Sequence, residues 1–288
     1  MSKKVVGVII GVVVAAIIIG SVLMLMYYKP LRPAPPSYAS LVKASEYARY
    51  EGLYALHLSM HMRATLLTRQ INASVLIGGL LTVGQDTYNR SYLSGSFMVT
   101  LSPTRGISYT VALPLEVAYL LNDSKIKICY NVTVRMLGKV SVARCNITNL
   151  KSAYAKLVEL REQMLKELEK HLKYIGTEKI AGLESYCYAG WVVLNVSKYM
   201  LKPRKTPTMI MLPKMPQVYN LTIEKVCYTT SGILTEFKAY MKPITSGTIT
   251  ITAKISLVLK KVKPGYFNEK LFKELLSLPV GPPVTITK

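Results

Sequence analysis

Two histidines, His57 and His61, are the first residues of this chain whose spacing could do chemistry. On a helix they would share one face four positions apart, and their imidazoles could bind one metal ion. The residues around them alternate between apolar and polar types, which indicates a half-buried strand instead. On a strand the two rings would lie ~13 Å apart, too far to share a metal ion. We therefore expect no metal site here.

Carboxylates that could act as acids or bases are few, since the chain has 15 acidic residues against 37 lysines and arginines. Asp86 and Asp123 are the only aspartates, and each stands near a predicted turn. The glutamates gather in Lys151–Tyr174, where they alternate with lysines as on a solvated helix face. No Ser-His-acid set, carboxylate pair or glycine-rich phosphate loop has a suitable context. The sequence therefore predicts a protein that is not an enzyme and that binds no cofactor.

Four cysteines form the next group with defined chemistry. In an exported chain they predict two disulfide bonds, in one of three connectivities. If a hairpin turns around Leu137, Cys129 and Cys145 are directly opposed. Their Cβ atoms then lie ~4.5–5.5 Å apart, close to the distance that a disulfide requires. Geometry therefore favours this pair, and Cys187 and Cys227 form the second bond by elimination.

Asparagines carry a third kind of chemistry, because seven of the nine stand in the Asn-x-Ser/Thr pattern of N-glycosylation. This excess over chance predicts a glycoprotein whose folded part lies outside the cytoplasm. The seven positions are Asn72, Asn89, Asn122, Asn131, Asn146, Asn195 and Asn220.

The N-terminal segment Val5–Met26 runs for 22 residues without a charge. A helix needs ~20 apolar residues to cross the hydrocarbon core, so this segment predicts a single transmembrane anchor. A cleaved signal peptide is the alternative, but its apolar region would be shorter and would end at small residues. Lysines flank both ends, so the sequons and cysteines decide the orientation in the cell membrane. The N-terminus is expected inside and the C-terminal domain outside.

Three parts of the chain follow from this interpretation. Residues 1–28 would hold a cytoplasmic stub and the transmembrane anchor, and 29–37 a proline-rich linker. Such a linker tends to polyproline II and would act as a stiff spacer of ~25–30 Å. Residues 38–288 would form an extracellular, β-rich ectodomain held near the membrane.

The ectodomain is expected to consist mainly of antiparallel strands, because period-2 alternation recurs along it. One strong helix, Lys151–Tyr174, interrupts the strands, and Gly176 stands just past its predicted end. A second short helix is predicted at Asn268–Leu276, with an asparagine cap. The predicted fold class is therefore α+β, with about ten antiparallel strands and a long central helix. The expected strands are 53–63, 72–83, 88–101, 105–113, 125–136, 139–148, 184–196, 217–229, 232–242 and 247–262.

The formal net charge of +22 predicts attraction to polyanions. The partners that fit are anionic lipid headgroups at the membrane surface or an anionic polymer of the cell envelope. A solvated basic surface in an acidic medium is the simpler interpretation. Nucleic acid is not expected as a partner, because the basic residues are scattered and no aromatic-basic motif or DNA-reading helix is present.

An insertion at 197–217 differs from the rest of the ectodomain in composition, since it is rich in methionine, proline and lysine. About twenty residues without a regular pattern inside a compact domain are either functional or loosely structured. Met209, Ile210 and Met211 form its apolar centre, and methionine adapts to irregular apolar partners. A loose surface insertion is the favoured interpretation, and a mobile lid or a flap that touches the membrane is the alternative.

Three stretches in the second half carry a resemblance to a known family. Gly176–Tyr188 resembles the pattern G-x-E-x-x-x-G-x-x-x-Y with which the LolA/LppX-type lipoprotein-carrier superfamily enters a strand. Val226–Leu234 is similar to the hairpin of that family, where an aromatic-bearing strand turns through a polar-glycine pair. Leu271 to Pro279 is similar to its closing "F…P" segment. The resemblance covers residues 53–280.

The resemblance implies a curved half-barrel sheet around an apolar cavity that holds acyl chains, with helices as a lid. It also implies that one face of the first strand lines this cavity and that the central helix caps it. A filled core is the alternative for the same residues. The lining residues would be Tyr54, Leu56, Leu58, Met60 and Met62, and the capping residues Tyr154, Leu157, Leu165 and Leu168. The lipobox cysteine of a lipid-tethered carrier is missing, which argues against long-range transport.

The sequence therefore favours a non-enzymatic, membrane-anchored extracellular glycoprotein that binds a lipid or another apolar ligand close to the membrane. The alternative is a structural protein of the cell envelope, such as an adhesin, a pilus-like subunit or a subunit associated with the surface layer. Glycosylated export and abundant lysine suggest an archaeal envelope. An apolar pocket of ~300–1,000 Å³ would favour ligand binding, whereas exposed strand edges would favour assembly.

Overall fold

The computed structural model describes residues 34–66, 69–104, 106–122, 125–135, 139–149, 154–195, 218–244 and 249–281. The chain divides into two compact units, Met1–Pro35 and Pro36–Lys288, and every element described below belongs to the second. The predicted anchor at Val5–Met26 and the insertion at 197–217 lie outside the described residues. Within the described ranges, the structure contains no helix that is long and apolar enough to cross a membrane.

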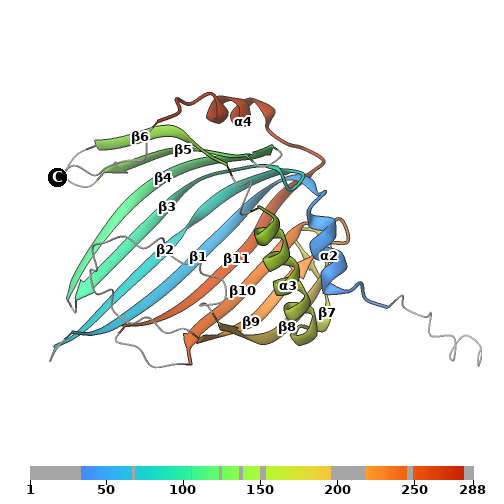
Figure 1. Cartoon of the computed structure of the whole chain (residues 1–288), viewed down its shortest axis with the longest axis horizontal. Helices are drawn as coiled ribbons and strands as arrows, with labels where there is room; N and C mark the ends of the chain where they lie inside the picture. Colours follow the sequence, from blue (N-terminus) through green and yellow to red (C-terminus); the bar gives the residue numbers. More distant parts are fainter. Residues whose placement is uncertain are drawn as a thin grey trace, which may run out of the picture. The chain divides into compact units, whose positions relative to one another are not determined.

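Eleven strands form one sheet, in which all neighbours are antiparallel (Figure 1). Their order across the sheet is β6-β5-β4-β3-β2-β1-β11-β10-β9-β8-β7, so the first and last strands pair in its middle. The strands are β1 (Arg49–Leu66), β2 (Arg69–Asp86), β3 (Arg90–Thr104), β4 (Ile107–Asn122), β5 (Lys125–Arg135), β6 (Lys139–Asn149), β7 (Lys173–Ile180), β8 (Leu183–Asn195), β9 (Val218–Tyr228), β10 (Leu234–Pro243) and β11 (Ile249–Pro264).

The predicted fold class, α+β with about ten strands and a long central helix, is wrong. The described residues are mostly strand, and the three described helices are short: α2 (Tyr38–Ser45), α3 (Tyr154–His171) and α4 (Glu269–Leu276). The additional strand is β7, whose first residues were assigned to the end of the long helix. That helix ends at His171, and a tight turn with positive φ at Ala181 and Gly182 pairs β7 with β8.

The two faces of the sheet differ because side chains alternate along each strand. We call the face that carries Tyr54, Leu81 and Phe97 the inner face; these three residues are buried and pack in one cluster. The opposite, outer face carries Tyr92 and the two histidines of β1. Figure 1 shows the sheet bending around α2 and α3 on the inner side, whereas α4 lies on the outer side over β5.

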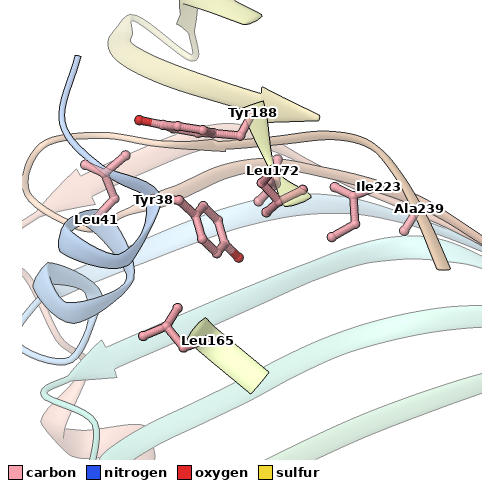
Figure 2. Packing of buried hydrophobic residues seen from close by; sticks show 8 residues of the cluster. Tyr38, Leu41, Leu165, Leu172, Tyr188, Ile223 and Ala239 are labelled. Atoms are coloured by element: carbon pink, nitrogen blue, oxygen red, sulfur yellow. The ribbon is translucent and has the colours of Figure 1, made fainter. Parts of the chain in front are cut away.

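Helices α2 and α3 cover the inner face at one end of the sheet. Ser37 caps α2, since its Oγ accepts a hydrogen bond of 3.1 Å from the backbone N–H of Ser40. The ring of Tyr38 packs edge-on against Tyr188, and burial raises the pKa of its hydroxyl to about 12. Leu165 of α3 lies in the same cluster, which also contains Ile223 and Ala239 of the sheet (Figure 2). Both helices therefore act as a partial cover of the inner face.

Helix α4 covers part of the outer face. Its cap is Asn268, as predicted, with Oδ1 accepting a hydrogen bond of 3.1 Å from the N–H of Leu271. Phe272 and Leu275 pack with the Cys129–Cys145 disulfide against β4, β5 and β6. Burial of these apolar side chains, worth roughly 25 cal/mol per Å² of area removed from water, stabilises the helix on the sheet.

Both predicted disulfides are present. Cys129 lies opposite Cys145 in the β5–β6 hairpin, in the register predicted from the sequence. Cys187 of β8 lies opposite Cys227 of β9. All four side chains are fully buried.

Candidate functional site

The inner face becomes more exposed along β1 from Tyr54 to Met62, away from the helices. Tyr54 is 1% exposed and donates a hydrogen bond of 2.7 Å to the carbonyl oxygen of Leu234. Leu58 and Met60 are half-buried, and Met62 is 37% exposed. The methyl group of Ala64, the next inner residue, is buried again. Tyr54 therefore belongs to the core, and Met60 and Met62 belong to a different, open region.

The register continues this open region across the sheet. Met60 pairs with Val75, Val75 with Leu101, and Leu101 with Tyr109, so these four side chains form one row on four strands. Leu101 is 38% and Tyr109 is 52% exposed. Ala253 of β11 extends the row on the other side of β1. The row carries no charged side chain.

We call this region the open apolar end and define it by six inner-face residues. They are Met60, Met62, Ile71, Val75, Leu101 and Tyr109. Directly opposed side chains on one face of a sheet stand ~4.5–5.5 Å apart, so the six form a continuous apolar surface. A surface of this kind on a folded protein is typical of a ligand or partner site.

The residues predicted to line a cavity are only partly brought together. Tyr54 is buried in the core and closed to a ligand, whereas Leu56 is half-buried against the same cluster. Leu165 and Leu168 of α3 pack with the cluster under α2, as capping residues of the inner face would. Tyr154 and Leu157 lie in the first turn of α3, but their side chains are outside the described part of the structure. Met209, Ile210 and Met211 lie outside the described residues as well.

Sequence reasoning missed the strands next to β1. The predicted site contained no residue of β2, β3 or β4, although Ile71, Leu101 and Tyr109 contribute as much exposed apolar surface as Met62. The signal that could have found them is the strict alternation in β3, where Leu93, Phe97, Val99 and Leu101 share a face.

A hollow of about 880 Å³ lies at the end of the sheet where β1 ends and where β2 and β11 begin. Its volume is in the range expected for a ligand pocket. Polar and apolar atoms contribute about equally to its surface, however, and most of its lining residues lie on the outer face. It is therefore not the purely apolar cavity that the resemblance implies, although it shares Met62 with the open apolar end.

The histidines predicted to lie on a strand do so. His57 and His61 stand on the outer face of β1, where they pair with Gly78 and Ser74 of β2. The Nε2 atom of His61 lies 3.2 Å from the hydroxyl of Ser59. Among the described residues, no group of three or more His, Cys, Asp or Glu side chains could hold a metal ion.

The sequons differ in how accessible their asparagines are. Asn72 and Asn122 are exposed at strand ends. Asn131 donates a hydrogen bond of 3.0 Å from Nδ2 to Glu116, which engages the nitrogen that a glycan would modify. The Oδ1 atom of Asn220 is buried and has no hydrogen-bond partner among the described residues.

The three remaining sequons lie in less favourable or undescribed positions. The Oδ1 atom of Asn89 accepts a hydrogen bond from the hydroxyl of Thr87. Asn146 pairs with Ile128 and lies on the inner face of β6. The side chain of Asn195 is outside the described part.

A charged cluster on the outer face surrounds the carboxylate of Glu236, which is 7% exposed. Lys225 and Lys238 lie 2.8 and 2.5 Å from its oxygens, and Lys225 also lies 2.6 Å from Glu178. Burial alone would raise the pKa of Glu236, but the hydrogen bonds and charges of the two lysines outweigh it and lower the pKa. Cys227 pairs with Glu236 in the sheet, so the cluster lies beside the second disulfide.

We expect Glu236→Gln to lower the free energy of unfolding by about 1–2 kcal/mol at pH 7, because Lys225 and Lys238 lose a buried carboxylate. A carboxyl group with a lowered folded pKa stabilises the fold above its unfolded pKa. That stabilisation is lost as the pH falls through the folded pKa. The difference in the free energy of unfolding between wild type and variant should therefore become smaller as the pH falls below 4.5, the ordinary pKa of a glutamate. Urea unfolding at neutral and acidic pH measures it.

Glu224→Gln is the matched control for this prediction. Glu224 lies 3.3 Å from Lys254 and is 40% exposed, so its loss should cost less than about 0.5 kcal/mol at any pH. A Glu236→Gln loss that stays constant from neutral to acidic pH would contradict the ionic origin of the effect.

No protein-family model matches the chain, and no curated protein matches it in sequence. Three solved structures are similar to it in fold. One is a β-barrel-like protein of the DUF1849 family from Brucella abortus, at 10% identity and a TM-score of 0.30, covering 77% of this chain and 100% of the other. Another is a DUF1329 family protein from Desulfovibrio piger, at 10% identity and a TM-score of 0.25, covering 83% and 97%.

The third is a LolA superfamily protein from Nitrosomonas europaea, at 9% identity and a TM-score of 0.17, covering 83% of this chain and 98% of the other. A LolA superfamily structure is thus among the proteins that the fold resembles, and the suspected resemblance is confirmed as a weak likeness. At these identities and scores the likeness concerns the fold alone.

Proposed function

We propose that this domain binds the acyl chain of a lipid, or a similar apolar ligand, on the open apolar end of its sheet. The observation that carries the proposal is the row of Met60, Val75, Leu101 and Tyr109, which is continuous across four strands and partly open to solvent. Exposed apolar surface costs roughly 25 cal/mol per Å², so a ligand that covers this row would gain free energy from it.

The shape of the surface suits an extended chain better than a compact ligand. The row runs across the strands, and neighbouring strands lie ~4.8 Å apart, so four strands span roughly 15 Å. A second row, formed by Leu58, Ile77, Val99 and Val111, lies next to it toward the core. An acyl chain laid along these rows would contact apolar side chains on both sides.

The proposal includes a location outside the cytoplasm and a role without catalysis. Two fully buried disulfides are typical of proteins that fold in an oxidising compartment. Exposed Asn122 offers a position for a glycan there. The excess of basic residues suits binding close to an anionic lipid surface.

The competing proposal, a structural subunit that assembles through strand edges, is less well supported. The edge strands of the sheet are β6 and β7. The end of the described chain pairs with β6, since Cys145 and Val280 form a bridge. β7 carries exposed Lys173, Glu178 and Lys179, and charges on an edge strand oppose further pairing.

We expect Leu101→Glu to weaken binding of an uncharged fatty-acyl probe at least tenfold, because it places a charge in the middle of the apolar row. Met98→Glu is the matched control, since Met98 lies on the same strand, is 52% exposed and faces the outer side. Its affinity for the probe should stay within about twofold of wild type. Titration of the purified full-length protein with a fluorescent acyl probe measures both.

Equal losses in the two variants would show that binding does not depend on the inner face. Extraction of the wild-type protein with organic solvent, followed by mass spectrometry, gives an independent readout. Co-purifying lipid that is lost in Leu101→Glu would support the proposal, and ordered polymers without lipid would favour the structural alternative.

A further inference from the structure

The outer face carries a set of hydrogen-bond donors at the same end of the sheet as the open apolar end. Arg63 of β1 pairs with Asn72 of β2 on one side and with Thr250 of β11 on the other. These three side chains are direct neighbours on one face, ~4.5–5.5 Å apart. The γ-hydroxyl of Thr250 also lies 3.5 Å from the carbonyl oxygen of Arg63.

A second polar row runs parallel to the first, two residues closer to the core. His61 pairs with Thr252 and with Ser74, and Ser74 pairs with Ser102 of β3. Together the two rows supply a guanidinium, an imidazole, an amide and four hydroxyl groups. All seven residues line the hollow of about 880 Å³.

The lining of this hollow is suited to an anion. None of its described lining residues is acidic, whereas Arg63 carries a permanent charge and is exposed. Hydroxyl, amide and guanidinium groups are the donors that bind phosphate oxygens in proteins. Lys254, close to this site on β11, is already paired with Glu224 and does not supply the charge.

The hollow also reaches the apolar side of the sheet. Met62 and Ala73 line it together with the polar residues, although these two residues pair with each other on the inner face of the sheet. Ile107, which is 49% exposed at the start of β4, lines it too. A ligand in the hollow would thus contact a cationic polar surface on one side and the beginning of the open apolar end on the other.

We propose that this hollow binds the phosphate headgroup of an amphiphile whose acyl chain lies on the open apolar end. This inference rests on the proposed function and adds the ligand class, an anionic phospholipid. Arg63 is the specificity-determining residue, with the phosphate oxygens accepting hydrogen bonds from its guanidinium and from the hydroxyls of the neighbouring strands. The imidazole of His61 can donate a further hydrogen bond from a ring N–H.

Two ligands that share one acyl chain test the inference. Lysophosphatidate carries a phosphate, and monoacylglycerol of the same chain length carries a hydroxyl instead. Full-length protein made without N-glycosylation leaves Asn72 free, and displacement of an uncharged fluorescent acyl probe reports binding. We expect wild type to bind lysophosphatidate roughly tenfold more tightly than monoacylglycerol.

Arg63→Gln should remove most of this preference and leave the affinity for monoacylglycerol unchanged. Lys260→Gln is the matched control, because Lys260 is exposed on β11, has the same charge and does not line the hollow. It should keep the preference within about twofold. A further loss of the preference at high salt would support the ionic origin.

Three results would overturn the inference. Equal affinity of wild type for the two ligands, or an equal effect of Arg63→Gln on both, would leave acyl-chain binding in place without a headgroup site. Displacement of lysophosphatidate by millimolar inorganic phosphate would indicate a site for free phosphate instead of a lipid. If neither amphiphile displaces the probe, the proposed function fails as well.

Discussion

Replacing Gly232 by alanine is expected to lower the free energy of unfolding by about 3–4 kcal/mol. Gly232 stands in the turn between β9 and β10 with φ +81°, a conformation that costs an L-residue roughly 1–2 kcal/mol. A Cβ atom at this position would lie 2.2 Å from the backbone nitrogen of Ser45 and 2.3 Å from the backbone carbon of Ala44. Because both are backbone atoms of α2, no side-chain rotation can relieve the clash.

The clash would push α2 away from the sheet. Tyr38 and Leu41 of that helix are buried in the cluster under α3, so displacement would expose them. The β9–β10 turn cannot move instead without losing its own bonds, since the N–H of Gly232 donates to Thr229 at 3.0 Å. Both ways of relieving the clash therefore reduce stability.

Gly182→Ala is the control that separates conformation from contact. Gly182 has φ +85°, but a Cβ atom there would meet nothing within 4 Å. We expect this variant to lose only about 1 kcal/mol. Urea unfolding followed by circular dichroism compares the two, and a Gly232→Ala loss no larger than that of Gly182→Ala would refute the close approach of α2.

Local features of the fold could be predicted from the sequence because neighbouring residues determine them. Alternation placed His57 and His61 on a strand, and the Asn268 cap marked the start of α4. The first disulfide was predictable as well, because the register of a hairpin is fixed by its own turn. In each case the information lies within about twenty residues.

Features that depend on distant parts of the chain could not be predicted. β7 is rich in charged residues and has the composition of a solvated loop, and it becomes a strand only through its pairing with β8. Whether Tyr54 or Met62 is accessible to a ligand depends on how much of the inner face α2 and α3 cover. That boundary is set by packing between segments more than a hundred residues apart, which no local pattern records.

The polar hollow shows the same limit. Arg63, Asn72 and Thr250 come from three strands, and the third is separated from the first by almost the whole domain. Only the pairing of β1 with β11 brings the last strand of the sheet beside the first. A single sequence suggests neither this neighbour nor the polar rows that result from it.

Loss of the Cys187–Cys227 disulfide is expected to lower the free energy of unfolding by about 4 kcal/mol. The bond joins residues separated by 40 positions, so it restricts a long loop of the unfolded chain. In the folded state β8 and β9 are also held by their register, and both sulfurs are fully buried. The double variant C187A/C227A keeps the site apolar, so the loss of the covalent link dominates its effect.

The Cys129–Cys145 bond gives the comparison for this prediction. It closes a separation of only 16 residues, and the same chain-entropy argument yields about 3 kcal/mol for its loss. The C129A/C145A variant also loses contacts with Phe272 and Leu275 of α4, which adds to its cost. Urea unfolding of both variants, and of reduced wild type, measures these losses in the free energy of unfolding. A loss below about 1 kcal/mol in C187A/C227A would mean that strand pairing, rather than the covalent link, holds β8 to β9.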